Sequence, residues 1–274
     1  MSGISLTKDA DFPDGATNLA RDKIKKEYCE NFLGERRTHM AQEDILITMQ
    51  ADLDRAMKKS ADQRRWGMLI DTRKCVGCHA CTIGCVAEYK LPPGVVYRPV
   101  MEQMTGIFPA VKQQFIPRPC FQCENPSCVS VCPVGATKKE PDGIVSINYE
   151  TCIGCRSCVA ACPYGARTFD RGNDYTEGTA QKQPYEAAVF YEYDKAWRRD
   201  GHSSAVVGSA RKCHFCTSRL TQGLLPVCVT TCIGRATYFG DLKDEQSLIR
   251  QTLKAGKPYR FKEETGNDPQ VYYL

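Results

Sequence analysis

The chain lacks any long hydrophobic run. Among its 274 residues, no apolar stretch approaches the roughly 18 residues that a bilayer span requires, so we expect any membrane attachment to depend on a partner. Residues 1–30 are polar with no apolar central region, and neither Arg36-Arg37 nor Arg64-Arg65 precedes an apolar stretch. We therefore expect no secretory signal, so that export would depend on the signal of a partner.

A block of like charge is also missing. Lys and Arg number 37 against 32 Asp and Glu, a formal charge of +5, and the basic residues are scattered along the chain. This charge counts every cysteine as neutral, and thiolate ligands would lower it. The small basic excess therefore gives no indication of a nucleic-acid partner.

Cysteine, by contrast, is abundant. Sixteen of the 17 cysteines fall into four groups of four, and each group has the spacing of an iron–sulfur ligand set. The groups are CVGCHACTIGC (Cys75, Cys78, Cys81, Cys85), CFQCENPSCVSVCP (Cys120, Cys123, Cys128, Cys132), CIGCRSCVAACP (Cys152, Cys155, Cys158, Cys162), and CHFC followed after eleven residues by CVTTC (Cys213, Cys216, Cys228, Cys232). Only Cys29 stands outside, and we expect it to be a free thiol without a role.

This spacing suits a [4Fe–4S] cube, which needs four thiolates from several directions. A Cys-x-x-Cys-x-x-Cys loop can cover three irons, and the fourth thiolate must come from elsewhere. In bacterial two-cluster ferredoxins the fourth cysteine of each run, usually followed by proline, binds the other cluster. Cys132-Pro133 and Cys162-Pro163 have that form, so we expect the motifs to pair into two-cluster units. A row of such centres indicates electron transfer rather than chemistry on a substrate.

Three other kinds of site compete with this interpretation. A disulfide framework suits short secreted chains, whereas 274 residues can build a core without such staples. A zinc ribbon pairs two Cys-x-x-Cys doublets across a longer gap and has no use for runs of four, although a zinc-bound scaffold remains an alternative. A radical enzyme that uses S-adenosylmethionine would leave one iron open, but every group here has four cysteines.

A weak internal repeat predicts the fold class. Cys132-Pro-Val-Gly-Ala136 matches Cys162-Pro-Tyr-Gly-Ala166, and Cys232-Ile-Gly-Arg-Ala236 is a looser copy. Pro141-Asp142-Gly143, between residues of β propensity, predicts a hairpin. Repeated hairpins around cysteine loops predict an α+β fold of interleaved ferredoxin-like units.

The flanking segments differ from the cysteine-rich part. Ile45, Met49, Leu53 and Met57 form one apolar stripe of a helix, for which we expect docking onto a partner subunit rather than packing on its own domain. Residues 171–204 form an insertion, whose aromatic residues make either a small core or a contact surface: Tyr175, Tyr185, Tyr191, Tyr193 and Trp197. After Gly240 we expect a helix over Asp244–Ala255 and an extended arm that ends at Leu274.

On these motifs, the chain resembles the four-cluster iron–sulfur (beta) subunits of the dimethyl sulfoxide reductase superfamily, of the polysulfide, thiosulfate, tetrathionate and arsenate reductase type. The resemblance covers about residues 66–274 and rests on the four cysteine sets in this order. Further segments also resemble the family: Leu69-Ile70-Asp71, Phe115 to Cys128, Thr217 to Cys232, Phe239-Gly240-Asp241-Leu242 and the terminal Val-Tyr-Tyr-Leu. The N-terminal extension and the insertion are not covered by it.

The resemblance implies a division of the chain. One ferredoxin-like unit, residues 67–118 with 205–240, would hold clusters one and four. The other, residues 119–170, would hold clusters two and three. The remaining parts would be the helical extension (1–66), the insertion (171–204), and the C-terminal helix and arm (241–274). It also implies four [4Fe–4S] clusters with exchanged fourth ligands. The implied sets are one (Cys75, Cys78, Cys81, Cys232), two (Cys120, Cys123, Cys128, Cys162), three (Cys152, Cys155, Cys158, Cys132) and four (Cys213, Cys216, Cys228, Cys85).

The resemblance further implies partners. A large catalytic subunit with a molybdenum or tungsten bis-pterin cofactor would act on the substrate, and an integral membrane quinone or cytochrome subunit would complete the circuit. This chain would relay single electrons between them and would be no enzyme on its own. We expect it at a membrane through its partner, on the periplasmic face by co-export, or alternatively in the cytoplasm. The alternative function is a polyferredoxin-like subunit of a cytoplasmic hydrogenase or formate dehydrogenase complex.

Residues beside the ligands could adjust the clusters. Lys74, Arg156 and Lys212 could raise reduction potentials, although we favour surface salt bridges as the explanation for them. Gly77 and Gly154 could let backbone amides approach a cube. For two histidines that follow ligands we expect contact with solvent or a neighbouring backbone rather than a ligand role: His79 and His214.

Overall fold

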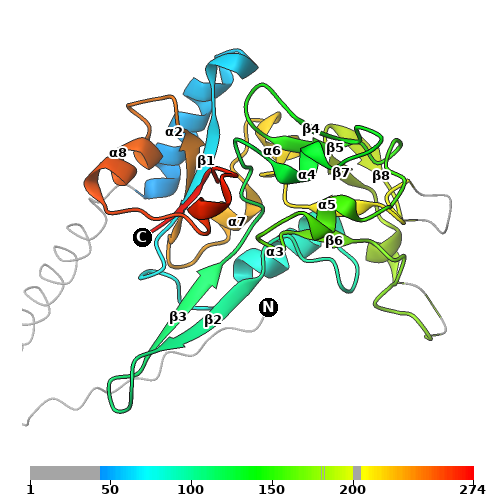
Figure 1. Ribbon diagram of the computed structural model, residues 1–274, viewed down its shortest axis with the longest axis horizontal. Helices are drawn as coiled ribbons and strands as arrows, with labels where there is room; N and C mark the ends of the chain where they lie inside the picture. The colour runs from blue at the N-terminus through cyan, green and yellow to red at the C-terminus, as the bar shows by residue number, and fades with distance from the viewer. Residues whose placement is uncertain (1–43, 180, 182, 200–204) are drawn as a thin grey trace, which may run out of the picture. The chain divides into compact units, whose positions relative to one another are not determined.

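The computed structural model describes residues 44–179, 181, 183–199 and 205–274 (Figure 1). Cys29, Arg36-Arg37 and most of the expected extension lie outside the described residues. Residues 45–274 form one unit, so the helix that ends the extension belongs with the cysteine-bearing part of the chain.

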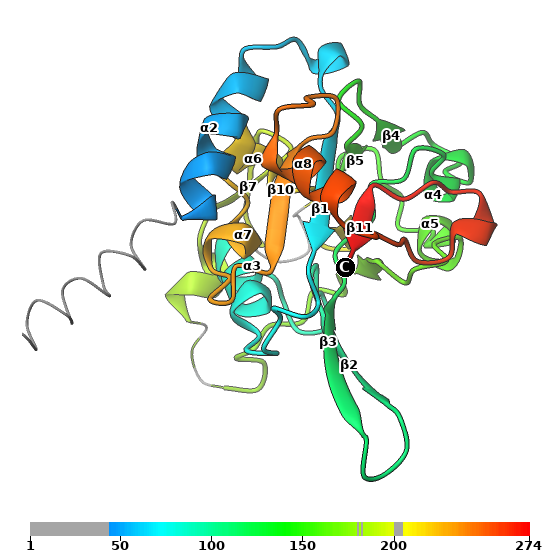
Figure 2. The same ribbon diagram turned by 90° about the vertical axis from the view of Figure 1, so that its left-hand side faces the viewer.

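A three-stranded sheet lies within this unit. β1 (Trp66–Ile70) stands between β10 (Thr237–Asp241), to which it is antiparallel, and β11 (Val271–Tyr273), to which it is parallel. All five residues of β1 are buried, as expected of a strand covered on both faces. Two helices, α2 (Ile45–Met57) and α8 (Leu248–Ala255), pack against β10 and cover this sheet (Figure 2).

Short helices carry the cysteine motifs. The first motif runs into α3 (Ala80–Tyr89), and the fourth contains α6 (Thr217–Leu220) and α7 (Val227–Thr230). The second and third contain α4 (Ser127–Ser130) and α5 (Ser157–Ala160). Because α3 packs against α7 and α4 against α5, the fold brings motif one to motif four and motif two to motif three.

Two-stranded ladders complete the described fold. They are β2 (Val100–Thr105) with β3 (Lys112–Pro117), β4 (Thr137–Lys139) with β5 (Val145–Ile147), β6 (Arg167–Phe169) with β9 (Ala210–Lys212), and β7 (Phe190–Glu192) with β8 (Lys195–Trp197). The β4–β5 pair confirms the hairpin predicted around Pro141-Asp142-Gly143. The β2–β3 hairpin extends away from the rest of the unit (Figure 2). Single 3-10 turns occur at Ala61–Gln63, Pro184–Ala187 and Glu263–Thr265.

The expected docking of the α2 stripe on a partner subunit is wrong. Met49, Leu53 and Ala56 are buried in the chain's own core, and the backbone N–H of Phe239 in β10 lies 3.3 Å from Met49 Sδ. The periodicity did predict the helix. Its apolar face is already covered by β10, which is distant in sequence.

The C-terminal helix is shorter than expected. It begins at Leu248 rather than Asp244, because the Ser247 side chain accepts a hydrogen bond from the N–H of Arg250 and caps the first turn. Only the end of the expected arm forms a strand, β11. Leu274, which follows this strand, accepts hydrogen bonds from both the N–H (3.0 Å) and the hydroxyl (2.6 Å) of Thr72, just before the first cysteine motif.

The aromatic residues of the insertion divide into two groups. Tyr193 and Trp197 pack edge-on against the buried Tyr149, at 5.8 and 5.2 Å between ring centroids. They therefore share a core with residues that precede the insertion. The remaining three are partly exposed at the surface: Tyr175, Tyr185 and Tyr191.

Candidate iron–sulfur centres

Four cysteines from two motifs line one cavity beside α4. Three come from the second motif, Cys120, Cys123 and Cys128, and Cys162 comes from the third. Three large side chains complete the lining and exclude water: Phe121, Val145 and Tyr164. Burial raises the pKa of the Cys123 thiol, and the other three thiols raise it further. This cavity gathers the members of set two.

A second cavity holds the converse combination. It is lined by Cys152, Cys155 and Cys158 of the third motif and by Cys132 of the second. Burial acts to raise the pKa of the Cys132 thiol, but hydrogen bonds from the backbone N–H groups of the chain just beyond it lower this pKa overall. Such amides would equally stabilise a thiolate bound to iron. This cavity gathers the members of set three.

The thiols of motifs one and four are also brought together. Burial raises the pKa of the Cys85 thiol far above its ordinary value, and the thiols of the fourth motif raise it further: Cys216, Cys213 and Cys228. Burial likewise raises the pKa of the Cys75 thiol, and Cys81 and Cys232 add to the shift. The neighbours of Cys85 and Cys75 are thus members of sets four and one. Cys78, the remaining member of set one, is exposed.

These donor sets fit an iron–sulfur cube better than a single ion. Among the described residues, no three Cys, His, Asp or Glu side chains converge closely enough to hold one metal ion, as a zinc site would require. The thiols of sets two and three instead surround a cavity, as ligands of a multi-atom cluster must. Because burial raises several of the thiol pKa values, cluster binding would release protons from these cysteines.

The basic residues next to the ligands differ in their environments. Lys212 is fully buried and donates a hydrogen bond of 3.0 Å to the carbonyl of Cys213, so a surface salt bridge does not explain it. Lys74 instead binds the Tyr238 hydroxyl at 2.6 Å. Arg156 lies 4.0 Å above the Phe169 ring. Only Lys212 of the three therefore presents a desolvated charge.

The two histidines also differ. His79 is exposed and has a left-handed backbone conformation, whereas His214 is 1% exposed and meets the other expected alternative, contact with a neighbouring backbone. Its Nδ1 accepts the N–H of Thr217 at 3.0 Å, which confirms the expected backbone contact. Burial lowers the pKa of His214 to about 4, so the ring is neutral at pH 7.

Sequence reasoning missed several buried polar residues beside the thiols. Arg167 donates a hydrogen bond from Nη2 to Cys128 Sγ at 3.1 Å, and Arg98 lies beside Cys81 and Cys228. The only sequence signal was position, because Arg167 stands five residues after Cys162, where the repeat has threonine after Cys132 and Cys232. Arg98 lies outside every motif, and no sequence signal marked it.

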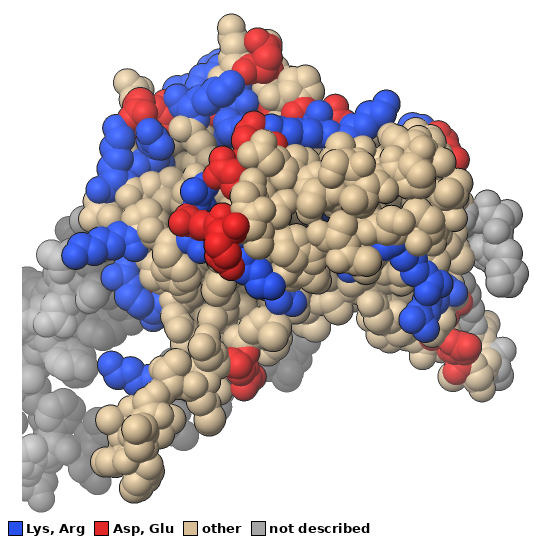
Figure 3. Space-filling view, viewed as in Figure 1, with Lys and Arg blue, Asp and Glu red and all other residues tan. Residues whose placement is uncertain are grey.

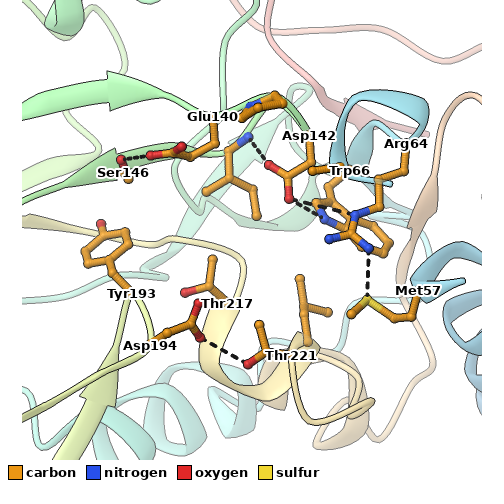
Figure 4. A pocket seen from close by; sticks show the side chains of 14 residues that line it. Met57, Arg64, Trp66, Glu140, Asp142, Ser146, Tyr193, Asp194, Thr217 and Thr221 are labelled. Carbon is orange, nitrogen blue, oxygen red and sulfur yellow. Dashed lines mark hydrogen bonds and ion pairs between the residues drawn. The ribbon is translucent and has the colours of Figure 1, made fainter. Parts of the chain in front are cut away.

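A separate cavity, of about 290 Å³, contains none of the cysteines (Figure 4). Its polar side chains pair with one another: Asp142 accepts a hydrogen bond of 3.1 Å from Trp66 Nε1, and Asp194 one of 3.0 Å from Thr221. These contacts explain the cavity as a seam between the β4–β5 hairpin, β1 and α6.

Within the described part of the chain, no helix is long and apolar enough to cross a membrane.

Comparison with known proteins agrees with this site. The family described as "4Fe-4S dicluster domain" matches residues 111–185 and 195–242. A selenate reductase subunit of Mesobacillus selenatarsenatis is 54% identical over 85% of this chain and 79% of its own length. Two further relatives are each 36% identical over 77% of this chain: the arsenate respiratory reductase iron–sulfur subunit of Shewanella sp., over 96% of its length, and the menaquinone reductase iron–sulfur cluster-binding subunit of Nitratidesulfovibrio vulgaris, over 88%.

The cysteine sets and these matches define an iron–sulfur protein of the electron-transport class. More narrowly, the chain belongs to the 4Fe–4S subunit group of the dimethyl sulfoxide reductase family, whose members are iron–sulfur subunits of reductase complexes in anaerobic respiration.

Proposed function

We propose that this chain holds four [4Fe–4S] clusters, bound by sets one to four, and relays single electrons within a reductase complex. The observation that carries the proposal is the exchange of fourth cysteines in two cavities, Cys162 with the second motif and Cys132 with the third. When bound, the clusters supply one-electron redox chemistry at potentials that the protein adjusts. The chain's own residues hold them, exclude water and fix their order.

Neighbouring thiols support a row in the order one, four, two, three. Cys81 of set one lies close enough to Cys228 of set four to raise the pKa of that thiol. In the same way, Cys120 of set two raises the pKa of Cys213 in set four. Arg167 lies beside thiols of both set two and set three. All four cysteines of set four are buried, in keeping with an interior position in the row.

Exposure marks the two ends of the proposed row. The two exposed cysteines among those described belong to its terminal sets: Cys78 to set one and Cys155 to set three. Apolar side chains are exposed beside each, Val76 and Ile233 at one end and Ile153 at the other. Charged side chains are also sparse over α4 and α5 (Figure 3). Uncharged surfaces beside accessible clusters suit the docking of redox partners.

One partner would be a catalytic subunit with a molybdenum or tungsten bis-pterin cofactor. The identity of 54% to a selenate reductase subunit supports a complex that reduces an oxyanion. The other would be an integral membrane quinone or cytochrome subunit, which the likeness to a menaquinone reductase subunit supports. We place the complex at a membrane through that partner, on the periplasmic face.

Purification of the native complex under anaerobic conditions tests this function. We expect copurified molybdenum or tungsten and, after reduction with a quinol, recovery of the iron–sulfur absorbance when selenate is added. Arsenate and tetrathionate serve as comparison acceptors. Iron–sulfur absorbance without a pterin metal would instead favour the hydrogenase or formate dehydrogenase setting. Zinc without sulfide would exclude the relay.

A further inference from the structure

Two arginines are buried without a carboxylate partner. Arg98 is 1% exposed and Arg167 is 3% exposed, and among the ion pairs of the described residues neither has an acidic partner. Arg211, equally buried, is paired with Asp170 and Glu192 at 3.1 and 2.6 Å. A buried charge is strongly destabilising unless an opposite charge lies close to it. Arg98 and Arg167 therefore need another source of negative charge.

Cysteines of the proposed ligand sets occupy the place of that counter-charge, and they would carry it as thiolates when they bind a cluster. Arg167 donates from Nη2 to Cys128 Sγ of set two at 3.1 Å and also lies beside Cys158 of set three. Arg98 lies beside Cys81 of set one and Cys228 of set four. Each guanidinium thus stands between two ligand sets. Arginine side chains stay protonated in proteins, so both guanidinium groups carry a fixed positive charge.

The two sites correspond within the internal repeat. Arg167 Nη1 donates to Thr137 Oγ1 at 3.1 Å, and Arg98 Nη2 donates to Thr237 Oγ1 at 2.7 Å. Thr137 and Thr237 each stand five residues after a fourth cysteine, Cys132 or Cys232. The same anchor therefore holds an arginine in each half of the molecule. One arginine comes from β6, and the other from the loop before β2. Two different segments supply one arrangement.

We propose that Arg98 raises the reduction potentials of the clusters in sets one and four, and that Arg167 raises those in sets two and three. The inference rests on the proposed function. Reduction adds one negative charge to a cluster, and a fixed positive charge nearby favours the reduced state. The effect is strong because the guanidinium is desolvated, whereas solvent screens the exposed Lys74 and Arg156. The arginines therefore adjust the relay in pairs.

The test is a redox titration of the native complex, in which electron paramagnetic resonance monitors the reduction of each cluster. Arg167→Met removes the charge and keeps much of the side-chain volume. We expect two of the four midpoint potentials to fall, each by about a tenfold loss in the reduction equilibrium, which is 59 mV for a one-electron couple. Arg98→Met should lower the other two. Arg98→Lys and Arg167→Lys keep the positive charge, so the midpoint potentials should stay close to those of the wild type. Arg250→Met, on the surface of α8, should change none of the four midpoint potentials.

Iron and acid-labile sulfide are measured in every variant. If a methionine variant loses iron, Thr137→Val and Thr237→Val remove the anchor and keep the charge, and they should give smaller shifts in the same pairs of clusters. Full iron with unchanged potentials would overturn this inference and leave the proposed relay intact. An equal shift of all four potentials in both methionine variants would also overturn it, because a general loosening would then be the cause. Wild-type complex without iron and sulfide would overturn the proposed function itself.

Discussion

At the scale of single residues, the fourth cysteines of the second and third motifs each lie with the cysteines of the other motif. Cys162 belongs to the third motif by sequence, yet it lines the cavity of the second motif's cysteines. Cys132 makes the reverse exchange. Each of these two motifs therefore contributes cysteines to both cavities, so under the proposed function the two cluster sites would be interdependent.

Serine substitutions test this exchange. We expect Cys162→Ser to alter the spectroscopic signal that Cys123→Ser alters, since both residues line one cavity. Cys152→Ser should alter a different signal, although Cys152 and Cys162 share one motif. Low-temperature electron paramagnetic resonance of the reduced variants distinguishes these outcomes. If Cys162→Ser and Cys152→Ser changed the same signal, the exchange would be wrong.

Gly154, inside the third motif, shows a second constraint on the cysteine loops. Its φ is +68°, and a Cβ there would lie 2.4 Å from the carbonyl oxygen of Gly208, just before β9. The sequence predicts only that this glycine admits backbone amides to a cube. The structure adds a close approach between two chain segments, which the sequence could not reveal because Gly208 is distant along the chain.

Gly154→Ala should therefore disturb set three. The left-handed backbone alone costs alanine roughly 1–2 kcal/mol, and the clash with Gly208 adds to it. Iron analysis should show a loss of about one cluster per chain. Gly178→Ala is the matched control, because Gly178 also has a positive φ but open space around it. An equal loss of iron in both variants would show that the close approach is unimportant.

At the scale of elements, polar contacts fix α2 on its own domain. Arg55 Nε binds Asp244 Oδ2 at 2.7 Å, and Asp52 accepts the N–H of Leu248 at 2.7 Å, so α2 joins the start of α8. Burial acts to raise the pKa of Asp244, but its hydrogen bond with Arg55 lowers this pKa overall. The ionised carboxylate therefore favours the docked helix.

This pair predicts a pH dependence. The folded-state pKa of Asp244 is lowered, so its stabilisation is present above the ordinary aspartate pKa of about 3.9 and is lost as the pH falls through the folded-state value. At pH 7 we expect Asp244→Asn to weaken the docking of residues 45–57 by about 0.5–1 kcal/mol, since Arg55 is partly exposed. Hydrogen exchange of that segment measures it. Glu245→Gln, on the neighbouring exposed carboxylate, should have no effect.

Local patterns predicted elements better than their contacts. The spacing of Met49 and Leu53 predicted α2 because helical periodicity is a property of neighbouring residues. Its cover, β10, could not be predicted, because that contact joins distant parts of the chain. The same holds for the C-terminal arm, which pairs with β1 as β11. The predicted start of α8 was early because the Ser247 cap was not recognised.

At the scale of the whole molecule, the spacing of cysteines was the most informative part of the sequence. Four motifs named sixteen candidate ligands, and two cavities bring together the cysteines of sets two and three. The assignment of the sixteen cysteines as ligands stays a prediction. The proposed order of the sets was not predictable, because it rests on contacts between motifs that are distant along the chain. Arg98 was equally hidden, since it reaches the thiols from a loop outside every motif.

The central claim is that one chain holds four [4Fe–4S] clusters in a continuous row. Its most direct test is the iron and acid-labile sulfide content per chain, measured in the anaerobically purified native complex and corrected for the metal content of its partner subunits. We predict about sixteen irons and an equal amount of sulfide for this chain. Zinc in place of iron, or iron for only two clusters, would contradict the account.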